Sequence, residues 1–195
     1  MKIFYYINHM NLNIYYFINE FNKNEIEKLQ PKISLIFRNY DRKKNPIELK
    51  ELVASCKKNR RKVYIANSLK DAIRFNFDGL YIPAFNKNLG FKNITRNSFE
   101  IIGSAHNVAE LKIKEKQGCS SIFLSPIFEN QKKKKFLDVV KTNFLRNLTK
   151  NQIVLLGGIN FKTLNKAKMC SPNGVAAISW IKKNGPSINT GPFKF

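Results

Sequence analysis

Short apolar runs rich in β-branched and aromatic residues alternate along this chain with longer polar stretches of helical periodicity. Such runs are typical of strands, and such stretches are typical of helices that cover a sheet. The expected strands are residues 14–18, 33–37, 63–66, 79–82, 100–103, 121–125, 153–157 and 174–179. The expected helices are residues 24–30, 46–58, 69–76, 108–117, 136–148 and 161–169. Strands that are apolar along their whole length and alternate with helices predict a parallel sheet with both faces covered.

Three of the expected helices begin with residues that favour a helix start. Asn45 stands before Pro46, and Ser68 and Asn107 each stand just before a helical stretch. Asn and Ser side chains accept hydrogen bonds from the free N–H groups of a first turn, and proline suits the first helical position.

Eight strand–helix units within 195 residues predict an α/β fold, a compact (β/α)8 TIM barrel. Residues 84–97 lack a long apolar helix, and the Gly-Pro pairs at 185–186 and 191–192 predict a reduced last helix. An open, doubly wound sheet is the alternative, but no GxGxxG motif follows the first strand. We therefore expect the closed barrel.

Two near-duplicate segments, residues 3–8 and 14–19, compete for the place of the first barrel strand. We expect the second to be that strand, because an expected helix follows it directly. The chain then divides into an N-terminal extension (1–12), the barrel (13–184) and a C-terminal tail (185–195), with the true start at Met1 or at Met10.

The charge of the chain is strongly positive, with 35 Lys and Arg against 13 Asp and Glu and a formal net charge of +22. This excess is typical of nucleic-acid binders. However, 28 of the basic residues are Lys spread along the whole chain, and no RNP-type or Cys/His-finger motif accompanies them. Nucleic-acid binding is therefore not the predicted function.

Three further absences in the sequence bear on where the protein works. No apolar run approaches the ~20 residues of a membrane helix, so no membrane partner is expected. The N-terminus lacks the pattern of a signal peptide. Cys56, Cys119 and Cys170 are far apart and form neither a disulfide framework nor a zinc motif, and they are expected to be inert. We expect a cytoplasmic protein.

Polar, cationic and glycine-rich positions follow the expected strands, where a (β/α)8 barrel carries its functional residues. They are Arg38, Asn39, Tyr40, Asn67, Ser68, Pro83, Ser104, His106, Ser125, residues 132–135, Gly157, Gly158 and Ser179. The two glycines after the seventh strand face the end of the eighth, where barrels often bind phosphate through backbone N–H groups.

Seven of these segments, in the same order, resemble the motifs of thiamine phosphate synthase and the related TenI-type thiazole tautomerases over about residues 14–182. LIFRNY (35–40) resembles Q-x-R-x-K, and 63–67 with Asp71 resembles I-N-D-R-x-D-L-A. FDGL (77–80) is similar to A-D-G-V-H and GSAHN (103–107) to G-x-S-x-H. SPIF (125–128), LGGI (156–159) and GVAAIS (174–179) are similar to G-P-I-F, I-G-G-I and G-V-A-V-x-S.

The resemblance implies a transferase that joins hydroxymethylpyrimidine pyrophosphate to a thiazole phosphate and releases pyrophosphate. It implies that Arg38 and Lys133 hold the leaving pyrophosphate, and His106 completes the expected catalytic set. The substrate-binding residues implied are Asn67, Ser104, Asn130, Lys132, Gly157, Gly158, Ile178 and Ser179. Within this set the resemblance implies that Asn67 and Ser104 contact the pyrimidine. It implies that Gly158, Ile178 and Ser179 hold the thiazole phosphate.

The sequence departs from the family pattern at its magnesium ligands. Ser68 stands in place of the first Asp, and residues 83–91 contain no acidic residue for the second. Mg²⁺ prefers carboxylate and phosphate oxygens, so its usual protein ligands are missing. Mg²⁺ therefore stays open as a cofactor, and no other cofactor is expected. The alternative is that the extra lysines at 132–135 offset the pyrophosphate charge without a metal.

Two alternatives to the transferase stay open. A TenI-type tautomerase would use His106 for proton transfer, for which imidazole is suited near neutral pH. A non-catalytic, phosphate-binding relative is the other, because a fold does not guarantee a reaction. The sequence leaves the oligomeric state open, a homo-oligomer included.

Overall fold

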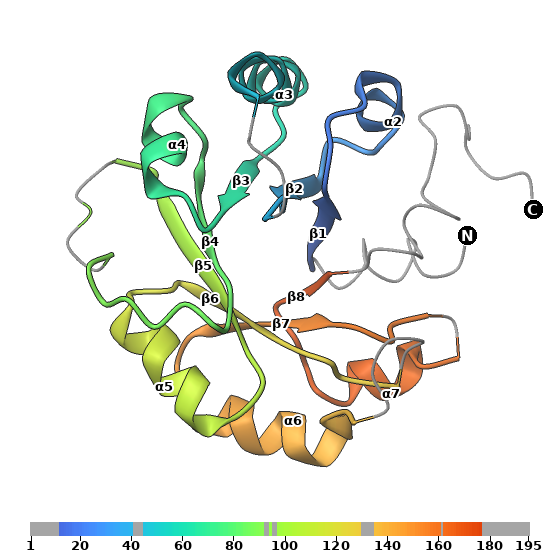
Figure 1. The fold of residues 1–195 in the computed structure, drawn as a ribbon. Helices are drawn as coiled ribbons and strands as arrows, with labels where there is room; N and C mark the ends of the chain where they lie inside the picture. Colours follow the sequence, from blue (N-terminus) through green and yellow to red (C-terminus); the bar gives the residue numbers. More distant parts are fainter. Residues whose placement is uncertain are drawn as a thin grey trace, which may run out of the picture.

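A closed barrel of eight parallel strands forms the centre of the protein (Figure 1). The computed structural model describes residues 12–40, 45–91, 94, 97–129, 135–160 and 162–176. The strands are β1 (Asn13–Ile18), β2 (Ile33–Phe37), β3 (Val63–Ala66), β4 (Gly79–Ile82), β5 (Glu100–Ala105), β6 (Ser121–Leu124), β7 (Gln152–Leu156) and β8 (Gly174–Ala176). Each strand pairs with the next, and β8 pairs with β1, so the predicted barrel is confirmed and the open sheet is excluded.

Helices lie around the outside of the strands (Figure 1). They are α2 (Lys23–Glu27), α3 (Pro46–Lys58), α4 (Leu69–Arg74), α5 (Val108–Lys116), α6 (Asp138–Asn147) and α7 (Leu164–Lys168). No helix occurs in the described part of the β4–β5 connection, as the sequence predicted. No helix in the described ranges is long and apolar enough to span a membrane.

The three predicted helix starts are confirmed by their hydrogen bonds. The side chain of Asn45 accepts from the N–H of Ile47 at 2.9 Å, and that of Asn107 accepts from the N–H of Glu110 at 2.9 Å. The hydroxyl of Ser68 accepts a hydrogen bond from the N–H of Asp71, in the first turn of α4, at 3.4 Å. Each cap satisfies a donor that the helix itself leaves free.

Some helices are shorter than predicted, for local reasons. Helix α2 ends at Glu27, because Pro31 disfavours helical backbone at the residue before it. Helix α7 begins at Leu164, because the side chain of Asn160 accepts from the N–H groups of Lys162 and Thr163 and forms a turn there. The predicted reduced last helix, the tail 185–195 and residues 1–11 of the extension lie outside the described residues.

The barrel interior is filled by side chains in layers drawn from alternate strands, as is usual for this fold. The middle layer comes from the even strands, with Ile36, Tyr81, Phe123 and Ala176. The layer beneath comes from the odd strands, with Tyr15, Tyr64, Ile102 and Val154. The layer above contains Phe17, Ala66 and Leu156. Ser104 completes this layer, because it lies two residues beyond Ile102 on β5 and therefore faces the same side, the barrel interior. The barrel is therefore a packed core rather than a pore.

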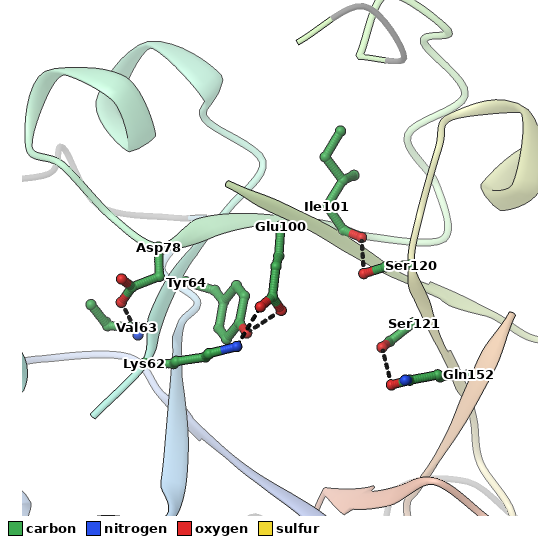
Figure 2. A network of polar contacts seen from close by, with 9 residues as sticks. All are labelled: Lys62, Val63, Tyr64, Asp78, Glu100, Ile101, Ser120, Ser121 and Gln152. Atoms are coloured by element: carbon green, nitrogen blue, oxygen red, sulfur yellow. Dashed lines mark hydrogen bonds and ion pairs between the residues drawn. The ribbon is translucent and has the colours of Figure 1, made fainter. Parts of the chain in front are cut away.

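A polar network lies at the N-terminal ends of β3, β4 and β5 (Figure 2). Glu100 accepts a hydrogen bond from the hydroxyl of Tyr64 at 2.8 Å and forms an ion pair with Lys62. Asp78 accepts from the N–H of Val63 at 2.8 Å. Burial and the charge of Glu100 raise the pKa of Tyr64, so its hydroxyl stays protonated and acts as a donor. This end contributes stability, which leaves the C-terminal end for chemistry.

Candidate active site

Arg38 is the first residue after β2 and lies over the C-terminal mouth of the barrel. Its N–H donates to the carbonyl of Ile18 at 2.7 Å, which ties it to the end of β1. Its guanidinium carbon lies 5.0 Å from the centre of the Phe17 ring, a cation–π geometry. The residue is half-buried, and the ring contact holds the guanidinium in place.

Ser104 lies directly below this mouth, with its side chain buried at 5% exposure. Tyr81, from the neighbouring strand β4, lies beside it in the barrel interior. Burial raises the pKa of Tyr81 to about 12, and the Ser104 contact and the Arg38 charge partly oppose that rise. Arg38, Ser104, Tyr81 and Phe17 thus converge from four different strands.

Tyr81 and Phe17 were not among the residues predicted from the sequence to form the site. Both belong to apolar runs that fit an ordinary buried strand. One signal in the sequence could have found Tyr81. Side chains alternate between the two faces of a strand, so Tyr81 and Gly79, two residues apart on β4, face the same side, the barrel interior.

His106 follows β5 and is held by two contacts. Its N–H donates to the carboxylate of Glu110 at 2.7 Å, and its Nδ1 pairs with the carbonyl of Ser125 after β6. A carbonyl only accepts, so Nδ1 carries a proton and Nε2 is the basic nitrogen of the neutral ring. The ring therefore links the ends of two strands and keeps one nitrogen for proton transfer.

Asn67, after β3, is fixed through both its backbone and its side chain. Its φ is 58°, a left-handed conformation that Asn tolerates, and its N–H donates to the carbonyl of Tyr81 at 2.9 Å. Its Oδ1 accepts from the Nδ2 of Asn86 at 2.6 Å. The β4–β5 loop thereby reaches across to the end of β3.

The turn after β7 consists of Gly157 and Gly158, whose φ angles are 91° and 73°. Glycine has no Cβ and adopts these large positive φ angles readily, whereas most other residues do so only with strain. A Cβ on Gly158 would lie 2.5 Å from the carbonyl oxygen of Phe128, and the N–H of Phe128 donates to Gly157 at 3.2 Å. The glycine turn therefore packs closely against the loop after β6.

An exposed aromatic pair lies beside the predicted residues. The rings of Tyr40, after β2, and Phe85, after β4, meet edge to face at 5.6 Å. Their exposures are 44% and 65%, so both present ring surface to solvent. Sequence reasoning missed Phe85, because an isolated Phe in a polar loop carries no signal of its partner.

Five predicted site residues lie outside the described residues, and their roles stay predictions. They are Asn130, Lys132, Lys133, Ile178 and Ser179. The structure brings Arg38 and Ser104 together around Tyr81, and it places Asn67, His106 and the glycine turn at the same end of the barrel.

The donor groups described after β3 and β4 do not fit a magnesium ion held by protein carboxylates. The oxygen of Asn67 is already bonded to Asn86, and the hydroxyl of Ser68 donates to Asp71 at 2.7 Å. The described part of the chain contains no cluster of three or more His, Cys, Asp or Glu side chains that could hold a metal.

The cysteines are buried and free, in agreement with their predicted inertness. Burial raises the pKa of Cys56 and of Cys119 to about 12, and it raises the pKa of Cys170. A thiol with so high a pKa carries little thiolate near neutral pH, which removes these residues from the list of nucleophiles.

The protein is a closed (β/α)8 barrel that carries a cation, a buried hydroxyl and a glycine turn at its C-terminal end, where barrels of this class hold their functional residues. Residues 27–181 match the family model described as thiamine monophosphate synthase. The chain belongs to this family.

One curated relative is the thiamine-phosphate synthase of Methanococcus vannielii, 32% identical over 84 residues. The match covers 42% of this chain and 41% of that protein, so the chain matches less than half of the relative's length.

Solved structures support the fold. A thiamine phosphate pyrophosphorylase from Pyrococcus furiosus superposes with a TM-score of 0.71 at 14% identity, covering 89% of each chain. The corresponding protein from Bacteroides thetaiotaomicron gives 0.61 at 17% identity, covering 93% of this chain and 90% of that one. FabK from Thermotoga maritima gives 0.65 at 9% identity over 88% of this chain and 60% of its own. At such identities the similarity establishes the barrel alone.

Proposed function

We propose that this protein is a transferase of the thiamine-phosphate synthase type, which joins hydroxymethylpyrimidine pyrophosphate to a thiazole phosphate. The observation that carries the proposal is the position of Arg38 at the mouth, above Ser104 and Tyr81 in the interior, in a barrel that belongs to this family. Arg38 offers a fixed cation, which suits a substrate with an anionic leaving group.

In this reaction the bond between the pyrimidine methylene carbon and the pyrophosphate oxygen breaks, and the bonding electrons leave with the pyrophosphate. The lone pair of the thiazole nitrogen then forms the new C–N bond, so that no proton has to move. Arg38 supports departure because its guanidinium binds the charge that develops on the leaving group. Its position over Phe17 orients it before the substrate arrives.

The apolar layer at the mouth has a second role in the proposal. A carbon cation next to the pyrimidine ring would react with water, and Phe17 and Leu156 form the apolar floor on which it would rest. Asn67 and Ser104 would bind the pyrimidine, and Gly157 with Gly158 would receive the thiazole phosphate. Asn130, Lys132, Lys133, Ile178 and Ser179 complete the proposed set from the family pattern.

The proposal assigns no reaction step to Mg²⁺, because the described donors do not fit its usual protein site. Arg38 and the proposed Lys132 and Lys133 would offset the pyrophosphate charge instead. Lysine is a less orienting partner than arginine, so Arg38 would fix the geometry and the lysines would add charge.

One observation favours a second candidate, a thiazole tautomerase. The Nδ1 contact of His106 leaves Nε2 as a base near the mouth. A tautomerase would act on a single carboxythiazole phosphate and would need this nitrogen.

Two reactions with purified protein separate the candidates. The first supplies both thiamine precursors and detects thiamine phosphate by mass, with each precursor alone as a control. The second supplies carboxythiazole phosphate alone and follows its isomerisation in the wild type and in His106→Ala. The transferase proposal predicts product in the first reaction only. Isomerisation that is lost in His106→Ala, without thiamine phosphate, would establish the tautomerase, and binding without any turnover would indicate a non-catalytic relative.

A further inference from the structure

Lys114 of α5 is completely buried and holds the loop between β4 and β5. Its ammonium donates to the carbonyls of Pro83 at 2.8 Å and Asn86 at 2.9 Å, and to the side-chain oxygen of Gln117 at 2.8 Å. All three partners are neutral oxygens. Lysine is rarely buried completely, and here its charge is spread over three acceptors.

The fold makes room for this side chain at Gly103. A Cβ on Gly103 would lie 2.9 Å from Cδ of Lys114 and 2.9 Å from Sγ of Cys119. A larger residue on β5 would therefore displace the lysine stem. The burial of Lys114 is thus built into the packing of α5 against the barrel, and it does not depend on one flexible contact.

Gln117 reinforces the same loop. It is completely buried, and its Nε2 donates to the carbonyls of Asn86 at 2.9 Å and Asn88 at 2.7 Å. The carbonyl of Asn86 therefore accepts from both Lys114 and Gln117. Lys114 of α5 and its C-cap residue Gln117 thus both hold the backbone of Asn86.

The hydrogen bonds around Asn86 determine the orientation of its amide. The N–H of Asn88 donates to Asn86 Oδ1 at 2.9 Å, which identifies that atom as the oxygen. The other side-chain atom is therefore the donor Nδ2, and it lies 2.6 Å from Asn67 Oδ1. Because the oxygen of Asn67 is occupied, Asn67 keeps its own NH₂ group for a ligand at the mouth.

We propose that Lys114 is a positioning residue, whose contact with Asn86 sets the Asn67 amide so that this position binds a hydrogen-bond acceptor and not a cation. An acceptor of this kind is a ring nitrogen of a pyrimidine. The identity of that ligand rests on the proposed function, whereas the chain of contacts from α5 to Asn67 does not. Lys114 acts through the β4–β5 loop, residues 83–99, which contains no Asp or Glu.

The test uses two variants and one matched control. Lys114→Met keeps the apolar stem and removes the ammonium, and Lys116→Met changes an exposed lysine of the same helix. Asn86→Asp leaves the backbone contacts of Lys114 in place but removes the Nδ2 donor. Asn67 must then turn its amide to donate to the new carboxylate, and its oxygen faces the mouth.

The first readout is ligand-free. The side-chain NH₂ resonances of Asn67 and Asn86 in a ¹⁵N-labelled protein should shift in Lys114→Met and stay unchanged in Lys116→Met. In Asn86→Asp the Asn67 resonance should move downfield and exchange more slowly with solvent, because its NH₂ becomes a donor to a carboxylate. Unchanged Asn67 resonances in both variants would overturn the positioning role, whatever the protein binds.

The second readout compares two ligands by calorimetry, hydroxymethylpyrimidine pyrophosphate and thiazole phosphate. Lys114→Met and Asn86→Asp should each weaken pyrimidine binding about tenfold, the loss expected for one misplaced hydrogen bond. Thiazole phosphate binding should change less than about twofold. An equal loss for both ligands would overturn the proposal in favour of general destabilisation. If the wild type binds neither ligand, the proposed function fails, and the resonances of Asn67 still decide the positioning role.

Discussion

At the scale of single residues, the site depends on groups that are oriented before a ligand arrives. Arg38 rests on Phe17, His106 is fixed by Ser125, and Asn67 by Asn86. Each contact removes rotamer freedom that binding would otherwise have to remove. The described contacts suit positioning and electrostatic stabilisation, which the proposed transfer with its charged leaving group would need.

Arg38→Lys tests the orientation of this cation directly. We expect kcat/KM for the transfer reaction to fall about 10- to 100-fold, because lysine loses the planar, two-pronged contact with the pyrophosphate. The free energy of unfolding should change by less than about 0.5 kcal/mol, since the side chain is half-buried.

The matched control is Arg74→Lys. The guanidinium carbon of Arg74, the last residue of α4, lies 5.2 Å from the ring centre of Phe75, so the same substitution is made over a second aromatic ring. Its kcat/KM should equal that of the wild type. An unchanged kcat/KM in Arg38→Lys would show that Arg38 contributes only its charge, and equal losses in the two variants would show an effect that is not specific to the mouth.

Lys114 also gives the protein a measurable pH dependence. Burial lowers the pKa of its ammonium from 10.5 to about 8, although Cys119 and Glu110 oppose the shift. Between these values the unfolded chain binds more protons than the folded one, so the contribution of Lys114 to the free energy of unfolding rises with pH. The difference in unfolding free energy, wild type minus Lys114→Met, should increase by about 1–3 kcal/mol between pH 8 and 10.5.

Denaturant unfolding at several pH values measures this difference. The same subtraction with Lys116→Met should give a flat line across the range, because Lys116 is exposed. A flat line for Lys114→Met as well would contradict the burial of a charged ammonium at this position.

At the scale of elements, the turn after β7 is the most constrained part of the mouth. Gly158→Ala places a side chain in a left-handed backbone and against the carbonyl of Phe128. We expect a loss of about 1–3 kcal/mol in the free energy of unfolding and weaker binding of thiazole phosphate. Gly90→Ala is the control, because its Cβ would meet only a side-chain oxygen at 3.3 Å. If both variants lose the same free energy of unfolding, a glycine at position 158 is not specifically required for stability.

Most elements could be predicted from the sequence because their signals are local. Apolar runs such as 63–66 and 79–82 match β3 and β4 to the residue, and the caps at Asn45 and Asn107 mark true helix starts. Arg38 and Ser104 could be placed at one end of the barrel because parallel strands bring their C-terminal ends together.

Other features could not be predicted because they depend on how distant segments pack. The sequence predicts a helix around Lys114, but its burial requires the space above Gly103 and the carbonyls of a loop 28 residues away. The ring contact between Tyr40 and Phe85 likewise joins two loops whose distance is set only by barrel closure. Nothing local in the sequence distinguishes these residues from their exposed neighbours.

At the scale of the whole molecule, the barrel separates stability from the candidate chemistry. The network of Glu100, Tyr64 and Lys62 occupies the N-terminal end, and Arg38, Ser104 and Asn67 occupy the other. The net charge of +22 favours anionic substrates in general, and because the described barrel interior is packed, the proposed binding place is the C-terminal mouth.

The most direct test is a single-turnover reaction with both precursors, enzyme in excess, and EDTA present in one of two parallel samples. The account predicts thiamine phosphate and pyrophosphate in equal amounts in both samples, because side chains supply the charge that the leaving group needs. Absence of thiamine phosphate with and without Mg²⁺, while both precursors are bound, would contradict the transferase assignment. Product only with Mg²⁺ would contradict the claim that side chains replace the metal.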